Sequence, residues 1–133
     1  MQRALDVAQR RLDQNDAPAR LLCGDVTRLG ELALGGRFDL VIDLKCFHGL
    51  PAESHAAYAV GVADACKPGA TYLLFARTPS RGRAVFGAPR GVSRVVVVRL
   101  LQRDFEPLDT TEASAGPFTP NVYLMRRRGV AAA

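Results

Sequence analysis

Two aspartates and one histidine stand where the sequence could perform chemistry. Asp25 closes a short apolar run after Gly24, Asp43 lies near the end of a longer apolar run, and His48 follows five residues later. In open α/β sheets, ligands bind at the carboxyl ends of the strands. A carboxylate there can accept hydrogen bonds from a ligand, and a histidine that titrates near neutral pH can act as a general base. The sequence therefore offers Asp25 and Asp43 as ligand-binding residues and His48 as a catalytic residue.

Each of these residues also has a purely structural interpretation, which the sequence leaves open. An aspartate such as Asp25 is common in turns and as the capping residue at a helix N-terminus. Asp43 can simply order the loop that follows its strand, and His48 can serve the turn in which it lies. Lys45 is expected to be solvated.

Other kinds of chemistry and binding have little support. The three cysteines, Cys23, Cys46 and Cys66, form no CxxC pair, so we expect no metal site and no disulfide framework. The net charge is +5, but the cations are spread along the chain. The one run of cations, Arg126–Arg128, is expected to be a solvated strand end. Because binding to nucleic acid requires cations clustered on one face, we do not expect nucleic acid as a partner. No apolar run is long enough to span a membrane, and the amphipathic N-terminus does not resemble a signal peptide, which predicts a cytoplasmic protein.

The elements that would position these side chains alternate between helix and strand. The length predicts one domain over 1–133. Predicted strands are Ala19–Cys23, Phe38–Leu44, Thr71–Ala76, Phe105–Thr111 and Asn121–Arg127. Predicted helices are Gln2–Gln14, a short one within Thr27–Leu34, and one that opens at Pro51 and ends before Lys67. This order favours an α/β fold with a parallel sheet and right-handed crossovers, closed by an antiparallel pair.

Three segments carry further expectations. Leu40, Val41 and Ile42 are consecutive apolar residues, which predicts a central strand buried on both faces, with Ile42 in the core. The segment 92–101 is ambiguous, because its four consecutive valines favour a strand while Ser93 could cap a helix. The arginine-rich segment 77–90 is expected to be a long surface loop.

Several of these stretches together resemble class I S-adenosylmethionine-dependent methyltransferases. The resemblance extends over nearly all 133 residues and rests on the order of the motifs. The matching stretches are Arg3–Ala8, Gly24–Val26, Phe38–Asp43, Phe47–Pro51, Lys67–Leu74 and Asn121–Arg126.

The resemblance implies a fold and a cofactor site. In the family strand order 3-2-1-4-5-7-6, the last strand is antiparallel and lies between its neighbours, and the segment 92–101 is a helix. Asp25 would accept a hydrogen bond from the adenine of S-adenosylmethionine, with Val26 beside it. Asp43 and Leu44 would contact the methionine part of the cofactor or the substrate. The implied function is methyl transfer to a small molecule whose identity the sequence does not reveal.

One departure from the family pattern concerns the cofactor-binding loop. The twelve glycines include no strand–GxGxG–helix unit, and Met1 already falls in the helix that follows the family's second strand. The fold is therefore expected to be a Rossmann-like methyltransferase sheet truncated at its N-terminus, with weak or absent cofactor binding. The alternative is a non-catalytic interaction or dimerisation module. Without strands 1 and 2, Phe38–Leu44 becomes a sheet edge, so we expect self-association through that edge.

Overall fold

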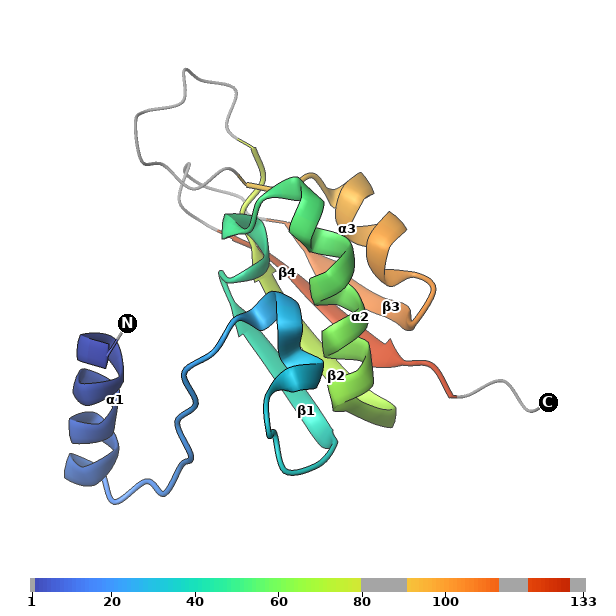
Figure 1. Cartoon of the computed structure of the whole chain (residues 1–133). Coiled ribbons are helices and arrows are strands. Elements are labelled where there is room, and N and C mark those ends of the chain that lie inside the picture. The colour runs from blue at the N-terminus through green and yellow to red at the C-terminus, as the bar shows by residue number, and fades with distance from the viewer. Residues whose placement is uncertain (1, 80–90, 113–119, 130–133) are drawn as a thin grey trace.

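The computed structural model shows one four-stranded sheet with two helices on one face (Figure 1). It describes residues 2–79, 91–112 and 120–129. The predicted loop 77–90 therefore lies mostly outside the described residues. Within the described residues, no helix combines the length and the apolar character that crossing a membrane requires.

The elements follow the predicted alternation of helix and strand. The helices are α1 (Gln2–Gln14), α2 (His55–Ala65) and α3 (Arg94–Leu101), and the strands are β1 (Phe38–Leu44), β2 (Cys66–Ala76), β3 (Phe105–Thr111) and β4 (Asn121–Arg127). Short 3-10 turns are η1 (Val26–Glu31), η2 (Phe47–Gly49) and η3 (Ala52–Ser54). In the ambiguous segment 92–101, residues from Arg94 onward form a helix, and the Ser93 hydroxyl caps it by accepting the Val96 N–H at 3.4 Å.

The sheet has the order β1-β2-β4-β3. β1 pairs with β2 in parallel, whereas β4 is antiparallel to both β2 and β3. This is the order 4-5-7-6 that the resemblance implied, with the last strand between its two neighbours. β1 is at the edge of the described sheet, as expected.

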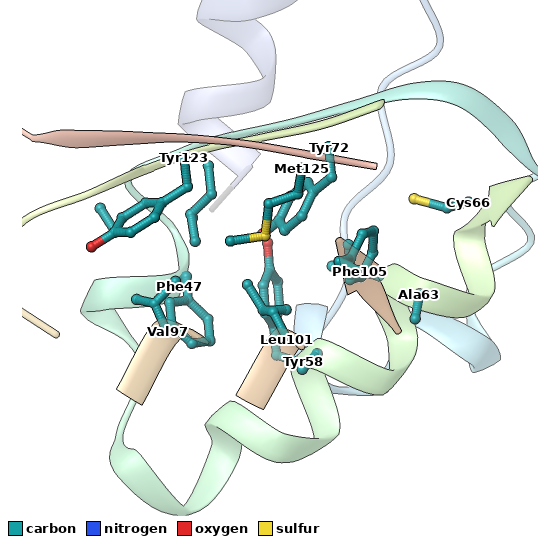
Figure 2. Close-up of a cluster of buried hydrophobic side chains, with 14 of the residues drawn as sticks. Phe47, Tyr58, Ala63, Cys66, Tyr72, Val97, Leu101, Phe105, Tyr123 and Met125 are labelled. Carbon is teal, nitrogen blue, oxygen red and sulfur yellow. The ribbon is translucent and has the colours of Figure 1, made fainter. Parts of the chain in front are cut away.

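The core lies between the sheet and the layer of α2 and α3 (Figure 2). Alternate side chains of β2 and β4 point into it, among them Tyr72, Leu74, Tyr123 and Met125, each at most 2% exposed. Leu101 of α3 packs against them from the other layer. The period-2 burial of β2 and β4 shows that this sheet has one covered face.

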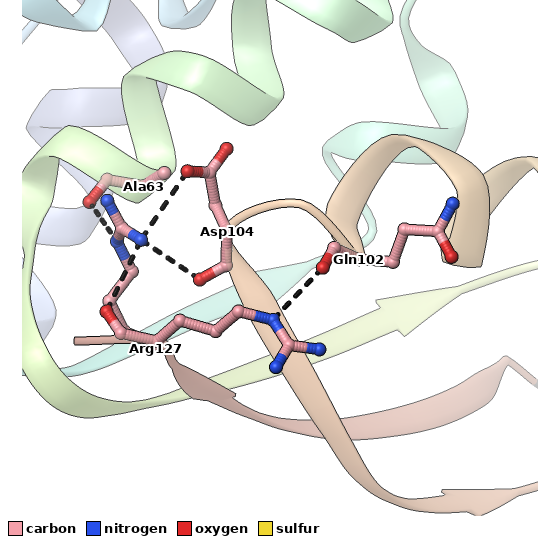
Figure 3. Close-up of polar contacts among 5 residues, drawn as sticks. Ala63, Gln102, Asp104 and Arg127 are labelled. Atoms are coloured by element: carbon pink, nitrogen blue, oxygen red, sulfur yellow. Dashed lines mark hydrogen bonds and ion pairs between the residues drawn. The ribbon is translucent and has the colours of Figure 1, made fainter. Parts of the chain in front are cut away.

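Arg127 corrects the expectation of a solvated strand end. Its guanidinium Nε donates to the carbonyl of Ala63, at 2.9 Å, and Nη1 donates to the carbonyl of Asp104, at 3.0 Å (Figure 3). The side chain is partly buried and also lies over the ring of Phe105. It thus joins the end of β4 to α2 and to the turn before β3.

Two further expectations are wrong. Ala19–Cys23 is not a strand: it forms no backbone pairing within the described residues, and an isolated apolar segment without a partner strand has nothing to complete its hydrogen bonds. β1 is not buried on both faces, since Ile42 is 51% exposed. Its outer side chains are uncovered because no described element packs on that face of the sheet closely enough to bury them.

Candidate functional site

The turn after β1 is built around the carboxylate of Asp43. This residue is 3% exposed, and both of its oxygens accept hydrogen bonds. Oδ1 accepts from the backbone N–H of Cys46 at 2.6 Å, and Oδ2 accepts from the N–H of Phe47 at 2.9 Å. The hydroxyl of Tyr58 on α2 donates to Oδ2 at 2.7 Å. Asp43 therefore fixes the turn and ties it to α2.

Aromatic rings pack against one another beside this carboxylate. Phe47 stacks on His55 and lies against Tyr58, with ring centroids 4.5 Å and 5.6 Å apart. Burial, aided by the neighbouring Tyr72 and the charge of Asp43, raises the pKa of Tyr58 far above its ordinary value. The pKa of Tyr72 is raised for the same main reason. Both phenols therefore stay protonated, and Tyr58 can act only as a hydrogen-bond donor to Asp43.

His48 lies in the same turn and is 2% exposed. Its Nδ1 accepts the backbone N–H of Arg77, at 3.2 Å, which places the ring against the end of β2. Burial, together with the positive charge of Arg77, lowers the pKa of His48. The ring is therefore neutral at neutral pH, with Nδ1 occupied as an acceptor. Its assignment as a catalytic base stays a prediction.

The carboxyl edge of β1 is exposed just before this turn. Leu44 is 72% exposed. Lys45 has a φ of 72°, in the left-handed region that non-glycine residues rarely occupy, and its N–H donates to the carbonyl of Phe75 at 3.1 Å. Such strained backbone is frequent at binding sites, where the surrounding structure holds it in place. The edge thus presents an apolar side chain beside a backbone kink.

Asp25 and Val26 lie in a second place, at the start of η1. The Oδ1 atom of Asp25 accepts the N–H of Thr27 at 2.9 Å and its hydroxyl at 2.7 Å. These hydrogen bonds lower the pKa of the exposed Asp25 carboxyl. Val26 is half-buried and packs against the core. Asp25 has the capping role that its structural interpretation required.

The structure therefore brings some of the predicted residues together and leaves others apart. Asp43 and His48 share the turn after β1, and Leu44 adjoins it. No described hydrogen bond links Asp25 to that cluster, and the roles of all five predicted site residues toward a ligand stay predictions. Sequence reasoning missed the bond from Tyr58 to Asp43, which local spacing could not reveal because fifteen residues separate the two.

An open hollow of about 360 Å³ lies between η1 and α2. Leu29, Leu34, Gly61 and Asp64 contribute to its lining. None of the predicted site residues lines it, so it lends no support to the assigned cofactor contacts.

Known structures share this fold. A methyltransferase from Clostridium acetobutylicum, dependent on S-adenosylmethionine, aligns with a TM-score of 0.77 at 15% identity, over 97% of this chain and 73% of its own. The N-methyltransferase NodS from Bradyrhizobium japonicum, solved with S-adenosylhomocysteine, aligns with a TM-score of 0.67 at 11% identity, over 90% of this chain and 61% of its own.

A third structure, from work on the conversion of a disulfide bond into a thioacetal group during echinomycin biosynthesis, aligns with a TM-score of 0.69 at 21% identity. The alignment covers 94% of this chain and 62% of that one. No protein-family model matches the chain. The chain thus has part of the α/β methyltransferase fold, and spans 61% to 73% of the length of these three structures.

Proposed function

We propose that this chain forms the carboxyl-terminal part of an S-adenosylmethionine-dependent methyltransferase that acts on a small molecule in the cytoplasm. The observation that carries the proposal is the sheet order β1-β2-β4-β3 with its mixed strand directions, shared with methyltransferases along most of the chain. The carboxyl end of β1 is where sheets of this kind bind ligands. S-adenosylmethionine supplies an electrophilic methyl group, and methyl transfer needs little from the protein beyond close and aligned approach.

The described residues fit part of such a cofactor. Both contacts of Asp25 with Thr27 use Oδ1, which leaves Oδ2 of this exposed carboxylate available to accept a hydrogen bond from the adenine amino group. Leu44 offers an apolar contact for the methionine part. Asp43 fits less well as a ligand-binding residue, since both of its oxygens already accept hydrogen bonds. We assign it as a positioning residue that holds the turn from Cys46 to His48.

The 133 residues on their own supply only a fraction of the contacts. A glycine-rich loop and a ribose-binding acid are not among them, and each charge-assisted hydrogen bond contributes about 1.5–3 kcal/mol. Losing two or three weakens binding by roughly a thousandfold. If a complete methyltransferase binds S-adenosylmethionine with a dissociation constant in the micromolar range, the same thousandfold loss gives the isolated chain a dissociation constant of roughly 1 mM.

Calorimetric titration of the chain with S-adenosylmethionine tests this proposal. Because of this thousandfold loss in affinity, we expect no saturable binding at cofactor concentrations below about 1 mM. Saturable binding well below that concentration would show that the cofactor site is more complete than proposed. If Asp25→Ala then left the affinity unchanged, the assigned adenine contact would also be wrong.

A second candidate function is that of a non-catalytic module that self-associates. Two observations favour it: β1 leaves the outer edge of the described sheet unpaired, and large apolar side chains along β1 are exposed. Unpaired strand edges promote pairing with other chains. The oligomeric state of the chain in solution is the measurement that bears on this candidate, independently of any cofactor.

A further inference from the structure

The sheet face opposite the core is apolar across three strands. The strand register aligns Ile42 of β1 with Leu73 of β2 and Leu124 of β4. In the next row it aligns Leu44 with Phe75 and Val122. We call these six residues the open face. Ile42 and Leu44 are 51% and 72% exposed, and the other four are half-buried.

Contiguous apolar surface of this kind is unusual on a protein that works alone. Phe38 and Leu40 of β1 are also exposed and extend the apolar surface along the strand. Soluble monomers rarely expose apolar patches larger than a few hundred Å² unless they bind something there. The open face therefore needs an apolar occupant.

Within the described residues, helix α1 also carries an apolar stripe that its own chain does not fully bury. Leu5, Ala8 and Leu12 form a stripe along it, flanked by charged residues, yet no residue of α1 is buried. In Figure 1, α1 lies beyond the β1 edge of the sheet, at the end of an extended segment. In Figure 2, most of the faint blue-violet helix lies on the side of the sheet away from the core, which is the side of the open face, and its lower end crosses behind the sheet.

The end of α1 fixes the direction in which the helix leaves the extended segment. Asp16 adopts a φ of 47°, and the N–H of Ala17 donates to the carbonyl of Leu12 at 3.0 Å. Such left-handed caps stop a helix in a defined geometry, and Pro18 prevents its continuation. The cap thus sets the angle at which the following segment leaves α1, and in Figure 1 the helix stands beyond the β1 edge, clear of the open face of its own sheet.

We propose that the chain forms a dimer in which α1 of each copy packs on the open face of the other. The dimensions agree: α1 is about 20 Å long, from 13 residues at about 1.5 Å each. β1 is about 23 Å long, from seven residues at about 3.3 Å each. Reciprocal exchange covers two open faces and two apolar stripes with one symmetric interface.

This inference rests on the second candidate function, self-association, and identifies α1 and the open face as the two surfaces that meet. The first test is the molar mass in solution by light scattering, for the parent chain, Leu12→Asp and the matched control Gln14→Asp. Both substitutions add a carboxylate near the end of α1, on opposite sides of the helix. Because no residue of α1 is buried in its own chain, neither variant should change the fold seen by circular dichroism.

We expect a dimer for the parent chain and for Gln14→Asp. Leu12→Asp should raise the dissociation constant by about a hundredfold or more, because exchange buries this leucine twice. If the chain is a dimer and Leu12→Asp does not weaken it, the exchange of α1 is wrong, although self-association through the β1 edge still stands. A monomeric parent chain overturns both.

A second test separates exchange between copies from packing within one. In a Cys23→Ser background, Ala8→Cys is placed in one chain and Leu73→Cys in another that carries a mass tag, and the two are mixed under mild oxidation. We expect a disulfide between the two different chains, more than with Gln14→Cys in place of Ala8→Cys. A disulfide that forms only when one chain carries both cysteines, leaving that chain monomeric, overturns the proposal.

Discussion

At the scale of single residues, the turn after β1 depends on one buried carboxylate. Asp43 takes two backbone donors from its own turn and one phenol from α2. That Asp43 would lie near the end of β1 was readable from the sequence, because the apolar run of Leu40, Val41 and Ile42 stops there. That Tyr58 would reach it was not, because this contact depends on how α2 packs on the sheet.

Asp43→Ala should lower the free energy of unfolding by about 3 kcal/mol or more, since it leaves buried donors without an acceptor. Asp39→Ala is the matched control: Asp39 lies on the same strand in an exposed ion pair with Lys67, and its loss should change stability by less than about 1 kcal/mol. Urea denaturation followed by circular dichroism measures both. Equal losses for the two variants would show that Asp43 does not hold the turn.

His48 makes stability depend on pH in a defined direction. Its pKa is lowered in the folded chain, whereas in the unfolded chain it titrates near the ordinary value of about 6.5. As the pH falls through that value, the unfolded state takes up the proton first, so His48's contribution to stability is complete above about pH 6.5 and is lost below it.

Urea midpoints at about pH 7.5 and about pH 5.5 bracket this range, where carboxylates titrate little. The parent chain should be less stable at the lower pH. His48→Gln should lose part of this difference. If the variant and the parent chain lose the same stability between the two conditions, His48 is not the group responsible.

At the scale of elements, the sequence was most informative where local signals and packing agree. β3 and β4 have the predicted bounds, and β4 shows the alternating burial of a strand with one covered face. Ala19–Cys23 has a similar run but no partner, and a strand exists only when another strand completes its hydrogen bonds. The burial of Ile42 was mispredicted for a related reason: an apolar run does not tell whether a second layer covers it.

Comparing Ile42→Asp with Leu74→Asp tests whether only one face of the sheet is covered by the core. Leu74 is 0% exposed and faces the core, whereas Ile42, one strand away, is half-exposed on the open face. Leu74→Asp should abolish the folded state, because it buries an unpaired carboxylate. Ile42→Asp should leave a folded monomer that unfolds cooperatively, with a loss of about 1–2 kcal/mol. Soluble yield and urea unfolding at low protein concentration give the result, and insoluble Ile42→Asp at that concentration would contradict the exposed position of this residue.

At the scale of the whole molecule, the strand order could be predicted only through the resemblance to methyltransferases. Composition and periodicity indicate an α/β sheet but do not say that β4 inserts between β2 and β3. The open face and the outward position of α1 were not predictable from the sequence, because both depend on which surfaces the fold leaves uncovered. Of the candidate site, the sequence indicates the two chain segments, the end of β1 and the start of η1, but the roles of their residues toward a ligand stay predictions.

Cofactor binding at these residues is tested by a nuclear magnetic resonance titration of the labelled chain with S-adenosylhomocysteine into the millimolar range. We expect progressive shifts of the backbone amides of Asp25, Val26, Leu44 and Lys45, with an apparent dissociation constant above about 1 mM. Amides of the distant strand β3 should not move, and Asp25→Ala should weaken the response. Shifts confined to other surfaces, or none at these four residues, would contradict the assignment of the β1 end and the start of η1 as a methyltransferase cofactor site.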